Sequence, residues 1–180
     1  MTRITAFVGA LALSTIAASQ AASASGIEQA GTAVAIALPL VAGGIALGHD
    51  QDWTGVAELS ADTLATVGTA YALKNVIREE RPDHSDFQSM PSDTAALAFA
   101  PAAFLWDRYG WEYGVPAYAA AAFVGYSRVD AKKHHWYDVA ASAGIAWGFS
   151  RIFTTEYHRP YSVYTYATPQ GAFVKVSFNF

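Results

Sequence analysis

The chain contains no cysteine among its 180 residues, which excludes a disulfide framework and thiol chemistry. Charge is also scarce: only 14% of the residues are charged, and the formal net charge is −4. This balance argues against a nucleic-acid-binding surface. Hydrophobic residues make up 53% of the chain, enough for one substantial core, and the length predicts a single domain.

The N-terminus has the three parts of a secretory signal. Arg3 gives a basic start, the stretch AFVGALALSTIAA is apolar, and the small residues of SQAASASG offer cleavage sites of the Ala-X-Ala kind. We therefore predict a signal peptide over residues 1–24 and export to a bacterial periplasm, where disulfides are permitted but not required. A short membrane anchor is the alternative reading, although the apolar stretch is short for a span.

After the predicted signal peptide, residues 29–48 form the longest run without a charged side chain, and about 20 apolar residues are enough to cross a bilayer. Pro39 and the pair Gly43 and Gly44 interrupt this run, and much of it is alanine and glycine. A buried helix packed closely against its neighbours explains the small residues equally well. The run alone does not decide between these two readings.

The next segment predicts a long helix over residues 53–80, because apolar residues recur there near the helical period. Glu58 and Asp62 lie one turn apart in it and argue against contact with lipid, and Pro82 marks its end. Three further helical segments follow, over residues 94–110, 114–129 and 135–153. These segments predict an all-α bundle of about five helices over residues 25–160.

The last part of the chain has a different pattern. Residues 161–180 contain two stretches of alternating apolar and polar residues, SVYTYATP and AFVKVSFNF, around a Pro-Gln-Gly turn. Alternation of this kind predicts a C-terminal β-hairpin.

The segment SRVDAKKHHWYD, over residues 127–138, concentrates the reactive side chains of the chain. If His134 and Asp138 share a helix, their spacing places both on one face. The carboxylate would then accept a proton from one ring nitrogen of His134 and leave the other free as a nucleophile. Arg128 would supply a planar fork for the oxygens of a phosphate.

Two stretches upstream complete a pattern. Residues 74–82 read KNVIREERP, which places Lys74 seven residues ahead of Arg81, and residues 91–94 read PSDT. In this order the three stretches resemble the motifs of the type-2 phosphatidic acid phosphatase and vanadium haloperoxidase superfamily. The first and third motifs match in full. The second matches only as Pro-Ser, because the family has Gly-His where this chain has Asp93 and Thr94.

The resemblance implies a role for each matching position. His134 attacks phosphorus to form a phosphohistidine, and Asp138 holds the histidine in the required tautomer. Four residues bind the phosphate: Lys74, Arg81, Ser92 and Arg128. Family members of the phosphatase type need no metal, so the resemblance implies neither a metal nor another cofactor. The fold it implies is also a helical bundle.

The departure at Thr94 is the main difference from the family, whose histidine at this place protonates the leaving group and later activates water. Threonine cannot act as an acid near neutral pH, and general acid help is typically worth 10²–10⁴-fold. Three explanations remain open. Asp93 takes over as the catalytic acid with a pKa raised by burial, His84 or His135 reaches in, or the protein binds phosphate with little turnover.

These features together predict an exported phosphatase of phosphate monoesters or diphosphates, on lipid phosphates above all, in the periplasm and in contact with a membrane surface. The alternative is a phosphate- or lipid-binding member of the family with weakened catalysis, and a vanadium haloperoxidase is a third reading. The substrate and the oligomeric state are not encoded in any motif of the sequence.

Overall fold

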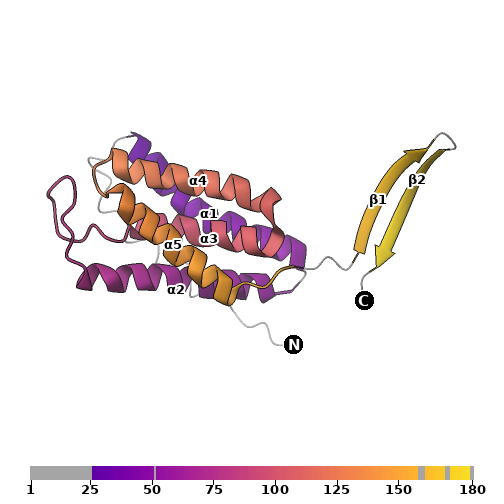
Figure 1. The fold of residues 1–180 in the computed structure, drawn as a ribbon, viewed down its shortest axis with the longest axis horizontal. Coiled ribbons are helices and arrows are strands. Elements are labelled where there is room, and N and C mark those ends of the chain that lie inside the picture. The colour runs from indigo at the N-terminus through magenta and orange to yellow at the C-terminus, as the bar shows by residue number, and fades with distance from the viewer. Residues whose placement is uncertain (1–25, 51, 158–160, 169–170, 179–180) are drawn as a thin grey trace, which may run out of the picture.

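The computed structural model describes residues 26–50, 52–157, 161–168 and 171–178. These residues form five helices followed by two strands, which Figure 1 shows along the chain. The helices are α1 (Gly26–Asp50), α2 (Thr54–Val76), α3 (Asp93–Tyr109), α4 (Trp111–Asp130) and α5 (Trp136–Phe153). The predicted all-α bundle of about five helices is confirmed.

Helix α3 forms the centre of the bundle and packs against each of the other four helices. Most of its residues are buried, and many are alanines, whose small side chains let neighbouring helices approach closely. Phe104 is the largest fully buried side chain at this centre. Because α3 is enclosed on nearly all sides, its N-terminus is held firmly among the ends of α2, α4 and α5.

Helix α2 is shorter than the sequence predicts and ends at Val76. The backbone turns extended at Ile77, and Glu79 forms an isolated bridge with Gln88. Farther along, the N–H of Arg81 donates to the carbonyl of Asp86 at 3.0 Å. Residues 77–88 therefore fold back as a loop beside the end of α2, because these pairs replace the last helical turn.

The two carboxylates of α2 face inward. Asp62 is fully buried, and Glu58 is bound to Arg108 of α3 at 2.8 Å. These two carboxylates therefore do not exclude lipid contact of α2, since the exposed positions of this helix carry no charge.

Strands β1 (Tyr161–Thr168) and β2 (Gly171–Phe178) pair antiparallel, in a register that runs from Tyr161 opposite Phe178 to Thr168 opposite Gly171. In Figure 1 the two strands lie apart from the five helices. The predicted signal peptide, residues 1–24, lies outside the described residues.

Candidate active site

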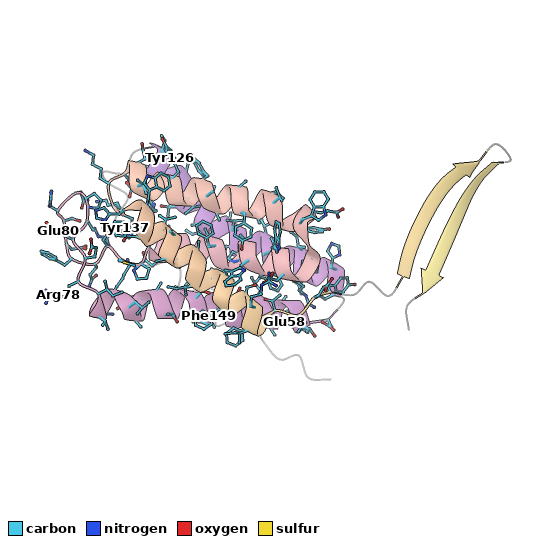
Figure 2. All side chains as sticks on the ribbon, in the orientation of Figure 1. Glu58, Arg78, Glu80, Tyr126, Tyr137 and Phe149 are labelled. Carbon is cyan, nitrogen blue, oxygen red and sulfur yellow. The ribbon has the colours of Figure 1, made fainter. Side chains whose placement is uncertain are left out.

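The end of the bundle where α3 begins brings the predicted site residues together. Lys74 lies in the last turn of α2, Arg128 in the last turn of α4, and Ser92 caps α3. His134 lies in the loop between α4 and α5, and Asp138 in the first turn of α5. Figure 2 shows this end through the labelled side chains of Arg78, Glu80, Tyr126 and Tyr137, with Glu58 at the other end.

His134 is buried, and its two ring nitrogens have different surroundings. Nδ1 lies 2.7 Å from the carbonyl oxygen of Ser89, which can only accept, so Nδ1 carries the proton and donates it. The lone pair of Nε2 then accepts a hydrogen bond from Nη1 of Arg81 at 3.3 Å. The structure thus holds His134 as a neutral imidazole whose Nε2 faces a guanidinium.

Asp138 acts on His134 from a different geometry than the sequence suggests. The two residues do not share a helix, because α5 begins at Trp136 and His135 is its N-cap. Oδ2 of Asp138 accepts the backbone N–H of His135 at 2.7 Å and lies 3.6 Å from Nδ1 of His134. The carboxylate therefore stabilises the ring through its charge, while the carbonyl of Ser89 takes the hydrogen bond.

Ser89 is the site residue that the sequence motifs miss. It is fully buried, its carbonyl fixes the ring of His134, and its hydroxyl donates to Oδ2 of Asp138. It lies outside all three motifs, and its position just ahead of the Pro91-Ser92 pair is its only sequence signal. Ser89 thus holds both His134 and Asp138 in place.

Arg81 and Lys74 face this histidine with part of their charge already paired. Arg81 donates from Nε to Asp86 at 2.8 Å and from Nη1 to the carbonyl of Lys133 at 3.0 Å. Lys74 is buried, and its ammonium lies 2.9 Å from Oδ1 of Asp93. Both cations are held in place by carboxylates at the rim of the site.

Arg128 is turned toward the first turn of α1. Its Nη2 donates to the carbonyl of Glu28 at 2.7 Å, and its Nη1 lies 3.4 Å from the carboxylate of the same residue. Nε donates to the hydroxyl of Ser127 at 3.3 Å. An anion that binds Arg128 as predicted must therefore compete with Glu28.

Ser92 has its predicted place as the cap of α3. Its hydroxyl accepts the N–H of Ala95 at 3.3 Å, and its own N–H lies 3.4 Å from the carbonyl of Asp138. The hydroxyl of Ser142 also donates to the carbonyl of Ser92 at 2.7 Å. These bonds fix the start of α3 against α5, where the helix dipole favours an anion.

The charges of the site lower the pKa of two groups. Burial lowers the pKa of His134, and the positive charges of Lys74 and Arg81 add to this effect against the opposing charge of Asp138. Burial alone would raise the pKa of Asp93, but the charge and the hydrogen bond of Lys74 outweigh burial and bring it below its ordinary value. Near neutral pH the histidine is therefore neutral and Asp93 is ionised.

The three candidates to replace the family histidine, His84, His135 and Asp93, have different surroundings. His84 is exposed and bound to Glu80 at 2.7 Å, so it does not reach His134. His135 stacks on Tyr137, with ring centroids 4.7 Å apart. Thr94 donates its backbone N–H to Asp93 at 3.0 Å, which leaves Asp93 as the carboxylate next to the replaced position. Among the described residues, no group of three or more histidine, aspartate or glutamate side chains is arranged to hold a metal ion.

Comparison with known proteins identifies the family of the chain. The model of the PAP2 superfamily matches residues 56–161. A lipid A 4'-phosphatase of Helicobacter pylori strain J99 is 35% identical over 131 residues, which cover 67% of this chain and 66% of that protein, just under two thirds of its length. No solved structure matches the chain. The chain belongs to the PAP2 superfamily of type-2 phosphatidic acid phosphatases.

Proposed function

We propose that the protein is a phosphoric ester hydrolase that removes phosphate from lipid phosphates or diphosphates through a phosphohistidine at His134. The observation that carries this proposal is the orientation of the buried histidine. Its Nδ1 is held by Ser89 at 2.7 Å and its Nε2 faces Arg81 at 3.3 Å. The relative in Helicobacter pylori, a lipid A 4'-phosphatase, supports a phosphorylated lipid as the substrate.

In the first step Nε2 of His134 attacks phosphorus in line with the leaving oxygen. The nitrogen–phosphorus bond forms, the bond to the leaving oxygen breaks, and its electron pair stays on that oxygen. Lys74, Arg81 and the N-terminus of α3 stabilise the charge on the other phosphoryl oxygens. The carboxylate of Asp138, 3.6 Å from Nδ1, stabilises the positive charge that the ring acquires.

In the second step water attacks the phosphohistidine, inorganic phosphate leaves, and His134 returns to its neutral form. The leaving group of the first step requires a proton only if it is a poor one. Asp93 is the candidate acid, but its ion pair with Lys74 at 2.9 Å favours the ionised form. A phosphate that displaces this pair would release the carboxylate, and a leaving group that is stable as an anion would need no acid at all.

The lateral surface of the bundle supports a lipid substrate. Between the two ends, the exposed side chains of α1, α2, α4 and α5 carry no charge. Large apolar side chains on this surface include Leu40, Leu64, Phe123 and Trp147. Among the described residues, α1 is the one helix that is long and apolar enough to cross a membrane, and little of its apolar window is buried. A surface of this kind suits the acyl region of a bilayer.

Aromatic side chains occur at both ends of this uncharged surface. Trp53 and Trp111 are exposed at the end opposite the site, and Tyr126, Trp136 and Tyr137 are exposed at the site end. Tryptophan and tyrosine favour the two interfaces of a bilayer. We therefore infer that the bundle is held in a membrane with His134 at one interface, where the phosphate of a lipid lies.

Export by a signal peptide remains a prediction, and it would place the site at the periplasmic face. Carbonate extraction of cell membranes tests the membrane placement. We expect the protein to stay in the membrane fraction, and release into the carbonate supernatant would contradict insertion of α1. Protease accessibility of the site loop in spheroplasts tests the side.

A second candidate function is a phosphate- or lipid-binding protein with little turnover. Two observations favour it: Thr94 stands where the family has its acid histidine, and Asp93 pairs with Lys74 at 2.9 Å inside the phosphate site. Substitution Thr94→His separates the two functions. If the missing acid limits a working enzyme, this variant hydrolyses poor leaving groups faster, whereas a pure binding protein gains nothing.

The test of the main proposal uses the purified protein in detergent with a panel of lipid phosphates. We expect phosphate release that is lost in His134→Ala, and acid-labile phosphate on the wild-type chain after rapid quenching. Activity retained by His134→Ala on every accepted substrate would contradict the assignment of His134 as the nucleophile.

The variant Asp93→Asn, assayed on substrates with good and with poor leaving groups, tests whether Asp93 is the acid. Slower hydrolysis of the substrates with poor leaving groups alone supports that role. Equal slowing of both kinds of substrate means that Asp93 only shapes the site.

A further inference from the structure

A hollow of about 460 Å³ opens beside the phosphate site, and no family motif accounts for it. It lies between the end of α2 and the loop of residues 77–88 that folds back beside that end. Its lining residues are Lys74, Asn75, Arg78, Asp86, Phe87 and Gln88. Lys74 belongs both to this hollow and to the predicted phosphate site, so the two spaces adjoin.

The charges of the hollow leave one cation without a carboxylate. Lys74 is paired with Asp93 at 2.9 Å, and Asp86 is paired with Arg81 at 2.8 Å. Arg78 is exposed and has no hydrogen bond or ion pair with any residue that the structure describes. Figure 2 shows its side chain at the site end of the bundle. A guanidinium with all five donors free is suited to a phosphate, which it binds as a planar fork.

The hollow adjoins the phosphate site through a second residue besides Lys74. Asp86, on the wall of the hollow, is bonded to Arg81 at 2.8 Å, and Arg81 lies 3.3 Å from Nε2 of His134. A phosphate that contacts both Lys74 and Arg81 therefore lies at the edge of the hollow. A second phosphate on the same substrate can then reach Arg78, which also lines the hollow.

We propose that this hollow binds a second phosphate of the substrate through Arg78, an inference that rests on the proposed phosphatase function. The preferred substrates then carry two phosphates, either joined in a diphosphate or separated on one polar head group. The exposed ring of Phe87 on the wall provides an apolar contact for the lipid part.

This subsite also accounts for the loss of the acid at Thr94 when the two phosphates are joined. Attack of His134 on the terminal phosphorus breaks the phosphoanhydride bond, and the electron pair stays on a leaving phosphate. A phosphate is a far weaker base than an alkoxide, so it departs without a proton. Arg78 and Lys74 then stabilise the charge that develops on it, and water later releases the terminal phosphate from His134.

The test compares three lipids with the same acyl chains: a monophosphate, a diphosphate, and a head group with two separated phosphates. We expect Arg78→Gln to lower kcat/KM by about 10- to 100-fold for a lipid whose second phosphate reaches the hollow, the range for a lost charged hydrogen bond. The monophosphate should change by less than about twofold, since it has nothing to bind there. Loss confined to the diphosphate identifies joined phosphates, and loss confined to the third lipid identifies separated ones.

The matched control is Lys132→Gln, which removes one exposed positive charge at the same end without touching the hollow. It should leave the ratio between the lipids unchanged. Inhibition by inorganic diphosphate gives a readout that does not depend on its turnover. Diphosphate should inhibit the wild type at a lower concentration than inorganic phosphate does, and this difference in concentration should become smaller in Arg78→Gln. An equal effect of Arg78→Gln on all three lipids, or no effect on any, would overturn the subsite. If Arg78→Gln gives either of these results while His134→Ala is inactive, the phosphatase function stands and only the subsite is wrong.

Discussion

The two ends of the bundle use arginine in opposite ways. At the end away from the site, Arg108 is buried and all three of its nitrogens are engaged, by Asp50 at 2.7 Å, Glu58 at 2.8 Å and the carbonyl of Thr155 at 2.9 Å among others. Asp50 accepts a further bond from the hydroxyl of Tyr109 at 2.8 Å. This network joins the end of α1, the start of α2, the end of α3 and the chain after α5.

At the site end the arginines differ in how far they are engaged. All three nitrogens of Arg128 have partners, two of them on Glu28. Arg81 is bonded through Nε and Nη1 only and lies 3.3 Å from Nε2 of His134, and Arg78 has no partner among the described residues. Hydrogen bonds made in advance hold a cation in place, but they also reduce what it can offer an incoming anion. The comparison therefore indicates a structural role for Arg108 and ligand binding for the incompletely engaged Arg81 and Arg78.

The largest effect should come from breaking the saturated end. In Arg108→Met the carboxylates of Asp50 and Glu58 remain buried without their partner, and loss of one member of a buried pair costs about 3–5 kcal/mol. We expect the free energy of unfolding in detergent to fall by this amount, while kcat of the folded fraction changes little. Lys132→Met is the control, because that lysine is exposed and has no ion pair with any residue that the structure describes, so its loss should change stability by less than about 0.5 kcal/mol. A large loss of kcat in Arg108→Met with an unchanged free energy of unfolding would contradict the structural role of Arg108.

The second effect should fall on activity and spare stability. Arg81→Gln removes the guanidinium 3.3 Å from Nε2 of His134, and loss of one such donor typically lowers the rate by about 10²–10³-fold. We expect this fall in kcat/KM on a monophosphate, with a change in the free energy of unfolding below about 1 kcal/mol because the pair with Asp86 is half exposed. Lys132→Gln serves as the control for the loss of charge. If Arg81→Gln unfolded instead, Arg81 would have a structural role like that of Arg108.

The third prediction concerns pH. Only neutral His134 can attack, and burial, Lys74 and Arg81 hold its pKa below the ordinary value of about 6.5. The rate, measured as kcat/KM, should therefore be flat near neutrality and fall about tenfold per pH unit below the lowered pKa. Because the fold favours the neutral ring, His134 also costs stability as pH falls below about 6.5. Loss of the Arg81 charge should raise the pKa of His134, so in Arg81→Gln the fall of kcat/KM at low pH should begin at a higher pH. If this fall begins at the same pH as in the wild type, another group is responsible for it.

The smallest effect should come from Glu28, which competes with the phosphate for Arg128. Glu28→Gln removes the carboxylate that lies 3.4 Å from Nη1 but keeps the backbone carbonyl. A partly exposed ion pair is worth up to about 1 kcal/mol, so inorganic phosphate should inhibit the variant at a concentration about two- to fivefold lower. The control is Glu112→Gln, an exposed carboxylate at the other end of the bundle. Weaker inhibition in Glu28→Gln would show that Glu28 positions Arg128 for the phosphate.

Sequence reasoning was strongest where spacing carries the information. The apolar periodicity predicted five helices, and the motifs placed His134, Arg81 and Lys74 at one site. It failed where a local pattern has two solutions. The spacing of His134 and Asp138 suits a shared helix, yet His135 caps α5 and the contact forms across the start of that helix. Ser89 had no motif, because its carbonyl binds His134 only through the packing of two distant loops.

The sequence by itself determined the family and the helical class and predicted the reactive residues, because these depend on residue type and on spacing along the chain. Only the tertiary structure decided how those residues act, because the direction of a charge and the partner it meets depend on long-range packing. Packing turned the carboxylates of α2 inward and paired Asp93 with Lys74. Packing also left Arg78 beside the site without a carboxylate, a difference from Arg108 that the chain order alone does not contain.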